Sequence, residues 1–216
     1  PYDRVSPSAQ SAAQRCAALA ELADQNSAAG ARIIHLTATS LVQKCAPRSV
    51  MSDASLILKA GAVVEQKKID RFLERNGYTR VPTVRDRGEF AQRGGIIDIY
   101  SANHVEPVRL DFFGDSLETI RSFDPESQRS TKQLNEVKFT PVSEIFFTDE
   151  VLSGFRTRFI ETFGAPGGDQ MYEAARSRIR KQGLENWLPL FHDQLESLFD
   201  YVGKDALWAF DPNAFA

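Results

Sequence analysis

The sequence is poor in the residues that disulfide frameworks and metal sites require. Its 216 residues include 2 cysteines and 3 histidines. Cys16 and Cys45 stand far apart and form none of the close pairs that metal sites use, which is typical of a reducing compartment. We expect both thiols to pack as small apolar side chains, and a redox pair or a nucleophile is the minor alternative.

Long apolar runs are also missing. No run approaches the ~20 residues that a membrane-spanning helix needs, and no basic-plus-apolar secretory start is present. We therefore expect a cytoplasmic chain. Its first residue is Pro1, which fits a segment of a longer protein.

Signatures of nucleotide binding and catalysis are absent as well. The sequence contains no GxxxxGK[ST] motif and no GxGxxG at a predicted strand-to-helix junction. The glycines of GAPGG (164–168) lack the Lys and Ser/Thr that phosphate and magnesium contacts need. His35, His104 and His192 show no metal-ligand spacing, and we expect His35 to be a core histidine. The sequence therefore predicts no catalytic residue, no metal site and no cofactor here, so this chain is not expected to be an enzyme by itself.

The overall composition is typical of an ordinary globular protein. Hydrophobic residues make up 42% and charged residues 25% of the chain, which is long enough for one large domain or two small ones. The formal net charge of -3 gives the whole chain no general attraction for nucleic acid. Function must therefore be sought in local patterns.

The first part of the chain alternates helix and strand signals. Residues 8–29 are Ala-rich with apolar residues at helical spacing, and Gly30 closes this predicted helix. An apolar run then predicts a strand over 31–43, and a second strand is predicted over 54–61. A strand directly after a helix and a glycine favours one repeat of a parallel α/β sheet.

From about residue 62 the pattern changes to one helix followed by closely spaced strands. The helix covers the residues before Gly77, a typical glycine just past a helix end. The predicted strands are 78–84, 94–100, 108–113, 116–123 and 134–142. Gly114 and Asp115 suit a tight hairpin turn, and FDPESQRS (123–130) reads as a turn or loop. We therefore predict a compact antiparallel α+β unit.

The remainder of the chain is mainly helical in pattern. Helices are predicted over 151–164 and over 168–183, the latter with Asp169 as its N-cap. An apolar cluster follows at 187–191, and residues 206–211 are predicted to form a last strand.

Strand alternation in VRLDFF (108–113) divides its side chains between two faces. Val108, Leu110 and Phe112 share one face, which leaves Phe113 on the opposite face with Arg109. An exposed aromatic residue beside an arginine is typical of a protein-binding hot spot. The alternative, a second layer that covers Phe113, remains open at this stage. Asp111 and Glu118, which the hairpin would place opposite each other, are expected to form a solvated face.

Arginines accumulate between residues 71 and 93, where three acidic residues oppose them. They are Arg71, Arg75, Arg80, Arg85, Arg87 and Arg93. Arginine suits both planar oxyanions and acidic protein partners, so a phosphate-facing patch and a protein-binding patch both remain open. RGEFAQRGGIIDIY (87–100) is not a phosphate loop, because a strand and not a helix follows its glycines. We expect Gly94 and Gly95 to allow a bulge or close packing there.

Residues 77–130 resemble the UvrB-interaction domain that UvrB shares with the transcription-repair coupling factors (Mfd). The similarity lies in the order GY, GEFAQRGGIIDI, PVRLDFFGD and FDPESQRS, whose last element has the form found in the coupling factors. PYDRVSP (1–7) and NWLPLFHDQLESLFDYV (186–202) also resemble their amino-terminal region.

The resemblance implies an architecture in three parts. A degenerate helicase-like α/β domain, with a parallel sheet and helices, would be interrupted by an inserted α+β domain with an antiparallel sheet. Residues 1–61 would be the latter part of the α/β domain, 62–142 the inserted UvrA-binding domain, and 143–216 the segment that closes the α/β domain.

The resemblance also implies partners and contact residues. The family binds UvrA through the inserted domain, and its interaction residues fall on Arg93, Arg109 and Phe113. RNA polymerase and double-stranded DNA would bind the full-length protein, and ATP with magnesium would bind in a translocase region outside this chain. The alternative is a fragment of a UvrB-like excinuclease subunit that handles damaged DNA.

Overall fold

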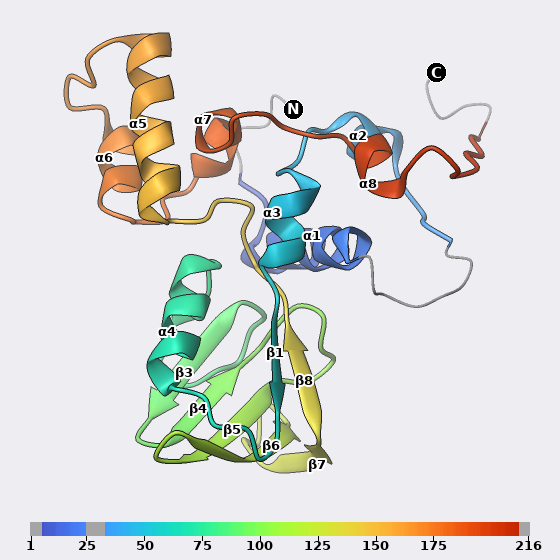
Figure 1. The fold of residues 1–216 in the computed structure, drawn as a ribbon, viewed down its shortest axis with the longest axis vertical. Helices are drawn as coiled ribbons and strands as arrows, with labels where there is room; N and C mark the ends of the chain where they lie inside the picture. The colour runs from blue at the N-terminus through green and yellow to red at the C-terminus, as the bar shows by residue number, and fades with distance from the viewer. Residues whose placement is uncertain (1–5, 25–32, 212–216) are drawn as a thin grey trace.

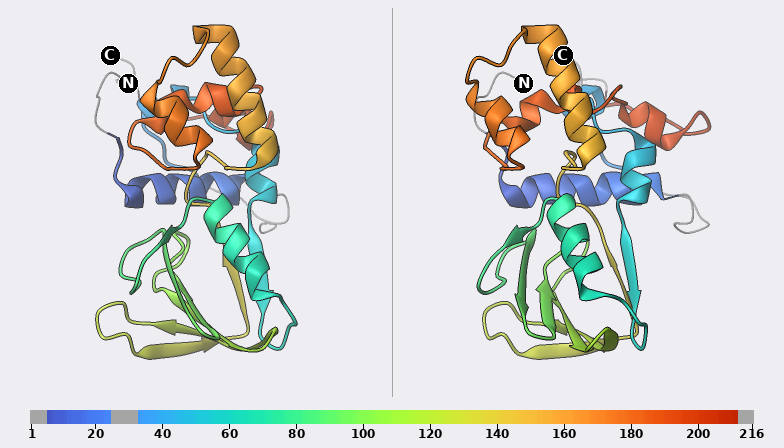
Figure 2. Two further views of the ribbon diagram at one scale, coloured as in Figure 1. Left: turned by 90° about the vertical axis from the view of Figure 1, so that its left-hand side faces the viewer. Right: turned by 60° about the vertical axis from the view of Figure 1, so that its left-hand side comes forward.

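The computed structural model describes residues 6–24 and 33–211, which form two bodies stacked along the long axis (Figure 1). The lower body holds strands β1–β8 and helix α4, and the upper body holds the other helices (Figure 1). Helix α1 (Ala9–Ala23) lies across the junction between them (Figure 2). Ala13 packs in the core of the lower body, whereas Cys16 and Leu19 pack in a core of the upper body.

Helix α1 begins where the sequence predicts it. The hydroxyl of Ser8 accepts a hydrogen bond from the backbone N–H of Ser11 at 3.1 Å, which satisfies one of the free donors at the helix start. Cys16 is buried in the face that α1 turns toward its neighbours. Residues 25–32, which include the end of the predicted helix and Gly30, lie outside the described residues.

The strand predicted over 31–43 is wrong for its described part. Ile33 is 85% exposed, and helix α2 (Ala38–Val42) replaces the end of the expected strand. Thr37 and Ser40 form a reciprocal capping box, which starts this helix at the polar residues read as a strand end. A short helix α3 (Arg48–Asp53) follows.

Strand β1 (Leu56–Lys59) confirms the strand predicted over 54–61, but its partner is not a parallel neighbour. It pairs antiparallel with β8 (Glu136–Phe139), and Leu56 lies opposite Phe139. Within the described residues, only β2 and β3 pair in parallel, so the expected parallel sheet is wrong. The architecture is α+β with a mixed, mostly antiparallel sheet. The hydrogen bonds of β1 come from a distant strand and not from a local repeat.

The main sheet of the lower body has the strand order β2-β3-β4-β5-β6-β7. Its strands are β2 (Thr79–Arg80), β3 (Glu89–Arg93), β4 (Ile96–Ile99), β5 (Val108–Phe113), β6 (Ser116–Phe123) and β7 (Ser130–Leu134). Every neighbouring pair after β3 is antiparallel, as the sequence predicts for this unit. Strand β8 follows β7 after one residue and turns away to pair with β1.

Helix α4 (Gln66–Arg75) covers the inner face of this sheet (Figure 2). Ile69 and Leu73 are fully buried against the apolar residues of the strands. The helix ends at Arg75 with Asn76 as its C-cap, and Gly77 has a φ of +97°, which confirms the predicted glycine stop. Burying a large aliphatic side chain stabilises a fold by roughly 1.5–3 kcal/mol, so this face anchors the helix.

The segment 87–100 is a hairpin and not a loop that leads into one strand. Strands β3 and β4 pair antiparallel around a turn at Gly94 and Gly95, so the sequence misses β3. The polar residues of EFAQR hide this strand, because Ala91 and Phe90 are its only apolar members. The close packing expected of the glycines is confirmed at Gly95, where the Phe112 N–H donates to the Gly95 carbonyl at 2.7 Å.

The upper body is organised around stacked aromatic rings. Its elements are α5 (Asp149–Phe163), α6 (Gln170–Arg176), η1 (Leu184–Trp187), α7 (Leu188–Phe191) and α8 (Leu198–Val202). Phe155 stacks on Phe191 with ring centroids 4.5 Å apart, and Phe159 stacks on Trp187 at 5.3 Å. The apolar cluster predicted at 187–191 is therefore part of a core.

Two predictions for the upper body need correction. Helix α6 begins with the predicted N-cap Asp169, but it ends at Arg176 instead of 183, because Arg178 adopts a left-handed φ of +57°. Residues 206–211 form no strand, and Leu207 is fully exposed. An apolar run becomes a strand only beside a partner, and the described residues offer none there.

Helices in the described ranges are all too short or too polar to span a bilayer.

Candidate protein-interaction surface

The two faces of the main sheet differ in what they contact. Ile97, Ile99, Val108 and Leu110 are fully buried on the inner face beneath α4, as predicted for the apolar set. Side chains of the opposite set lie on the outer face. We define the outer-face patch as Arg93, Ile96, Arg109, Phe113 and Arg121, with Asp98 beneath them.

Phe113 is the most exposed aromatic residue of this patch. Its side chain is 83% exposed at the end of β5, where it pairs with Ser116 beside the turn at Gly114. Of the two alternatives left open by the strand pattern, exposure is confirmed. Ile96, which is 38% exposed, lies opposite Asp111 and adds a second apolar side chain to the same end of the patch. Sequence reasoning missed Ile96, although its position at the start of an alternating strand could have indicated its face.

Arg109 is held by a carboxylate on the neighbouring strand. Its Nε donates to Asp98 Oδ1 at 2.7 Å and its Nη2 donates to Asp98 Oδ2 at 2.9 Å. Its guanidinium also lies 4.6 Å from the centre of the Phe123 ring. These hydrogen bonds to Asp98 raise the pKa of Arg109 above its ordinary value. The arginine is therefore fixed in place and only 17% exposed.

Arg93 reaches the same carboxylate from the other side. Its Nη2 lies 3.5 Å from Asp98 Oδ2, and its side chain is 60% exposed. The structure thus brings Arg93 and Arg109 together on one acidic residue. Phe113 lies four residues further along β5 on the same face, at the edge of the patch. A single aspartate inside an apolar strand was the signal for this pairing, and sequence reasoning missed it.

Arg109 also connects the sheet to the turn predicted at 123–130. Its Nη1 donates to the backbone carbonyl of Gln128 at 3.4 Å. Gln128 has a left-handed φ of +60°, and its side-chain amide donates to the carbonyls of Val84 and Pro125 at 3.1 and 2.7 Å. The turn is confirmed, and these bonds give a physical reason for its glutamine.

Asp111 has a different partner from the one expected. It lies opposite Thr119, whose hydroxyl donates to Asp111 Oδ2 at 2.8 Å, and Arg121 forms an ion pair with the same oxygen. The register shifts after this pair, which leaves Glu118 as an exposed extra residue in a bulge. The predicted opposition of Asp111 and Glu118 is therefore wrong, because strand alternation alone does not reveal a bulge.

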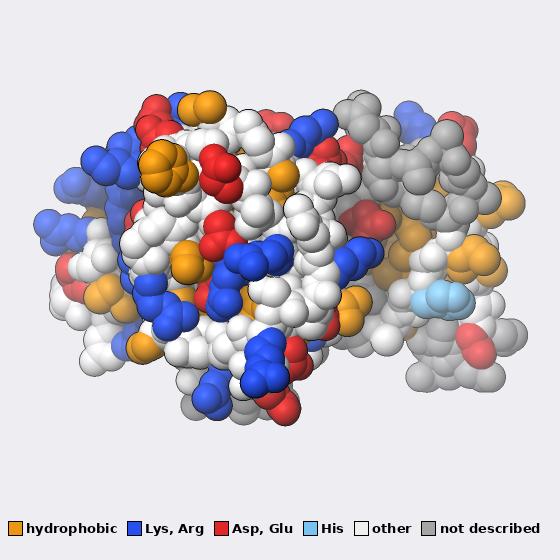
Figure 3. Space-filling view, turned by 90° about the horizontal axis from the view of Figure 1, so that it is seen from below, with side chains coloured by type: hydrophobic (Ala, Val, Ile, Leu, Met, Phe, Trp, Pro, Cys, Tyr) orange, Lys and Arg blue, Asp and Glu red, His pale blue; other side chains and the backbone are white. Residues whose placement is uncertain are grey.

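The other arginines of the basic stretch are only partly available. Arg80 lies 3.5 Å from Asp70 and over the Phe90 ring, and Arg87 lies over the Tyr100 ring at 5.0 Å. Seen from below, Lys and Arg side chains crowd one side of the lower body, while Asp and Glu side chains are interspersed nearer the centre (Figure 3). This mixture weakens the phosphate-facing alternative, because nearby carboxylates repel a nucleic-acid backbone.

Both cysteines are buried, which confirms the packing interpretation. Burial raises the pKa of the Cys16 thiol, and burial raises the pKa of the Cys45 thiol to about 11, so neither side chain is a ready nucleophile.

Two of the histidines bind backbone carbonyls, and the third is exposed. Nε2 of His104 donates to the Lys138 carbonyl, and Nε2 of His192 donates to the Glu144 carbonyl, both at 2.8 Å. His35, predicted as a core residue, is exposed. Within residues 6–24 and 33–211, no group of three or more His, Cys, Asp and Glu side chains is placed to hold a metal ion.

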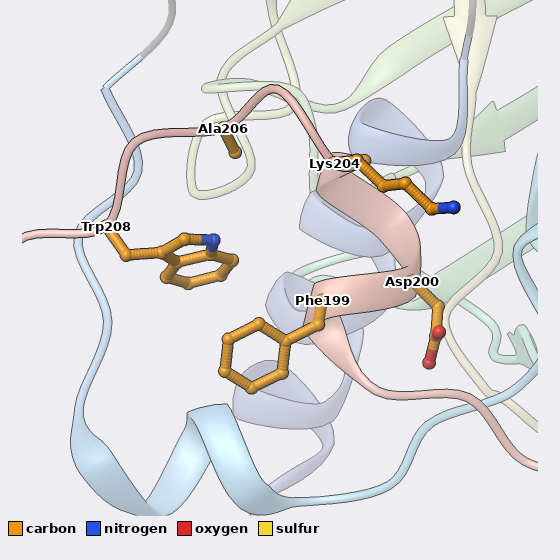
Figure 4. A pocket seen from close by; sticks show the side chains of 6 residues that line it. Phe199, Asp200, Lys204, Ala206 and Trp208 are labelled. Atoms are coloured by element: carbon orange, nitrogen blue, oxygen red, sulfur yellow. The ribbon is translucent and has the colours of Figure 1, made fainter.

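A cavity of about 460 Å³ lies in the upper body, away from the outer-face patch. The rings of Phe199 and Trp208 flank it with centroids 4.5 Å apart, whereas Asp200 and Lys204 point away from them (Figure 4). This arrangement offers an apolar hollow on which Asp200 and Lys204 do not converge.

Comparison with known proteins gives a family for this surface. Residues 56–145 match the UvrB interaction domain. The chain is similar to the transcription-repair-coupling factors of Haemophilus influenzae (33% identity), Myxococcus xanthus (35%) and Escherichia coli (27%) over 96%, 94% and 96% of its length, respectively. It spans 17–18% of the length of these relatives. The matched range starts at β1 and ends after β8, so it contains the whole outer-face patch. The chain therefore belongs to the transcription-repair-coupling factor family, as the amino-terminal UvrB-homology region that carries the UvrB interaction domain.

Proposed function

We propose that this chain is a protein-interaction module that binds UvrA and recruits it to stalled RNA polymerase in transcription-coupled nucleotide excision repair. The observation that carries this proposal is the exposure of Phe113 on the same sheet face as the Arg93–Asp98–Arg109 cluster. The match to a UvrB interaction domain supports the same function, since that domain contains every residue of the patch.

Phe113 supplies the apolar part of the proposed contact. At 83% exposure nearly all of its ring is available to a partner, and burying a Phe side chain contributes roughly 1.5–3 kcal/mol. Aromatic and arginine side chains that a partner can bury are frequent binding hot spots. We therefore assign Phe113 as the anchor and Arg93 with Arg109 as its cationic border.

We assign no catalytic step and no cofactor to this chain. ATP with magnesium, DNA translocation and contacts with RNA polymerase and double-stranded DNA belong, in this proposal, to the rest of the longer protein. The place of action is the cytoplasm. A fragment of a UvrB-like excinuclease subunit is the alternative, and the coverage of the coupling factors over 94–96% of this chain argues against it.

The direct test is titration calorimetry of UvrA with the wild-type chain and with Phe113→Ala. We expect the substitution to weaken binding by about 2 kcal/mol, with a change in unfolding free energy within about 0.5 kcal/mol because the ring is exposed. Leu207→Ala is the matched control, because Leu207 is also a highly exposed apolar residue but lies in the upper body. Equal affinities of Phe113→Ala and the wild type would refute the proposed contact. Salt-sensitive binding to duplex DNA without binding to UvrA would favour the excinuclease alternative.

A further inference from the structure

Asp98 occupies an unusual position for a carboxylate. It lies in the middle of β4 between Ile97 and Ile99, which are fully buried on the inner face. Its own side chain faces the outer side of the sheet, where it is still only 1% exposed. A buried charge without partners is very costly, so its oxygens must be satisfied by neighbouring groups.

Two arginines satisfy these oxygens, and they do so unequally. Arg109 lies directly opposite on β5 and forms the two-bonded fork at 2.7 and 2.9 Å. Arg93 on β3 makes one longer contact of 3.5 Å with Oδ2, an oxygen that Arg109 already uses. Fork-shaped arginine–carboxylate pairs are the stronger and more directional kind. Asp98 therefore binds Arg109 firmly and Arg93 loosely.

Exposure follows the same division. Arg109 is 17% exposed, is stacked on Phe123 and donates to the Gln128 carbonyl, so it is held on several sides. Arg93 is 60% exposed and its contact with Asp98 is long, at 3.5 Å, so it can leave Asp98 at small cost while the fork from Arg109 stays in place. One carboxylate between two guanidiniums leaves one positive charge, and that charge resides on the movable Arg93.

We propose that Asp98 is a positioning residue of the outer-face patch: it fixes Arg109 as a scaffold and holds Arg93 ready to exchange Asp98 for a carboxylate of the partner. This inference rests on the proposed function, with UvrA as the partner. Asp98 itself does not touch the partner, because it lies beneath the two arginines.

Asp98→Asn separates this role from simple attraction between charges. If the patch worked only through its total positive charge, removal of one negative charge would tighten binding to an acidic partner. If Asp98 positions the arginines, the same substitution loosens both of them and weakens binding. The two explanations therefore predict changes of opposite sign.

The experiment uses the full chain and purified UvrA, with affinity measured by calorimetry and the arginine Nε–H signals followed by NMR. For Asp98→Asn we expect roughly tenfold weaker binding and loss of the protected Nε–H signal of Arg109. Glu118→Gln is the matched control, because it removes one carboxylate from the exposed bulge of the same sheet, and we expect its affinity to equal or slightly exceed that of the wild type. Wild-type or tighter binding by Asp98→Asn would overturn the inference.

A second variant covers the case in which Asp98→Asn does not fold. Asp98→Glu keeps the charge but displaces the fork by one methylene, and we expect weaker binding with a shifted Arg109 signal. Unchanged affinity and an unchanged signal in Asp98→Glu would also overturn the inference. The NMR readout needs no partner. If wild-type chain failed to bind UvrA, the proposed function would fail, while the effect of Asp98 on Arg109 would still be decided by the signal in the free chain.

Discussion

Arg109 and Asp98 lie directly opposite each other on β5 and β4 and are joined by two hydrogen bonds of 2.7 and 2.9 Å. Because Asp98 is almost completely buried, this pair is part of the internal structure of the sheet as well as part of its surface. The residue that family resemblance assigns to partner binding thus has a second role in stability. That double role determines which substitutions can test the surface.

Arg109→Ala is expected to destabilise the fold. It leaves the buried Asp98 carboxylate with only the 3.5 Å contact to Arg93, and removing one partner of a buried ion pair costs about 3–5 kcal/mol. Urea unfolding monitored by circular dichroism measures this loss. Arg93→Ala is the control, for which we expect a loss of no more than about 1 kcal/mol. Equal stabilities of the two variants would show that the fork does not support the sheet.

Arg93→Gln is expected to change the salt dependence of UvrA binding. The exposed guanidinium of Arg93 carries the available positive charge. Salt at 0.1 M screens the attraction between exposed charges that are more than about 10 Å apart. Association rates measured at low and high salt should differ less for the variant than for the wild type. Arg176→Gln, an exposed cation of the upper body, provides the comparison and should retain the wild-type dependence.

Gly95→Ala is expected to be more harmful than Gly94→Ala, although the two residues are neighbours. A Cβ at residue 95 would overlap the carbonyl oxygen of Phe112, and such overpacking costs about 2 kcal/mol or more. A Cβ at residue 94 meets no atom within 4 Å, so only its φ of +58° is penalised, by about 1 kcal/mol. Thermal unfolding of both variants measures the difference, and the reverse order of stability would contradict the hairpin geometry.

His192 is expected to make the fold less stable in mild acid. Burial lowers the pKa of its imidazole below the ordinary value of 6.5, so below that pH the unfolded chain binds a proton that the folded chain resists. The stabilising contribution of the neutral ring is complete above pH 6.5 and is lost as pH falls through the folded-state pKa.

His192→Gln should therefore reduce the loss of unfolding free energy between about pH 7.5 and about pH 5.5. Urea titrations at both pH values check this. Leu207→Ala changes an exposed side chain that does not titrate and serves as the control, since it should leave the pH dependence as in the wild type.

Arg180→Ala is expected to loosen the connection between the two bodies. The guanidinium donates to Ser143 Oγ, to the Ile145 carbonyl and to the Arg75 carbonyl at the end of α4, at 2.7, 3.1 and 3.2 Å. Loss of these bonds should cost about 2 kcal/mol and make protected amides of α4 exchange faster. Hydrogen exchange measures this effect, and Arg176→Ala, whose ion pair with Glu173 is exposed, should show no such change.

Several parts of the fold could be predicted because their signals are local. Two-residue alternation in 108–113 places Phe113 on the face opposite Leu110, and Gly114–Asp115 connects two strands of matching pattern. The 3.6-residue spacing before Gly77 defines the helix that ends there. In each case the physical cause lies within a few residues, so no knowledge of distant contacts is needed.

Other parts depend on partners far away in the chain. Strand β1 takes its direction from β8, about 80 residues later. The apolar run near Ile33 and the apolar run over 206–211 find no partner strand in the described residues and form no strand. The sequence by itself determined the faces of β5 and the helix before Gly77, whereas the tertiary structure decided that Phe113 is exposed. Only the tertiary structure decided that Asp98 would join Arg93 to Arg109, because a buried carboxylate selects its partners from whichever strands the fold brings beside it.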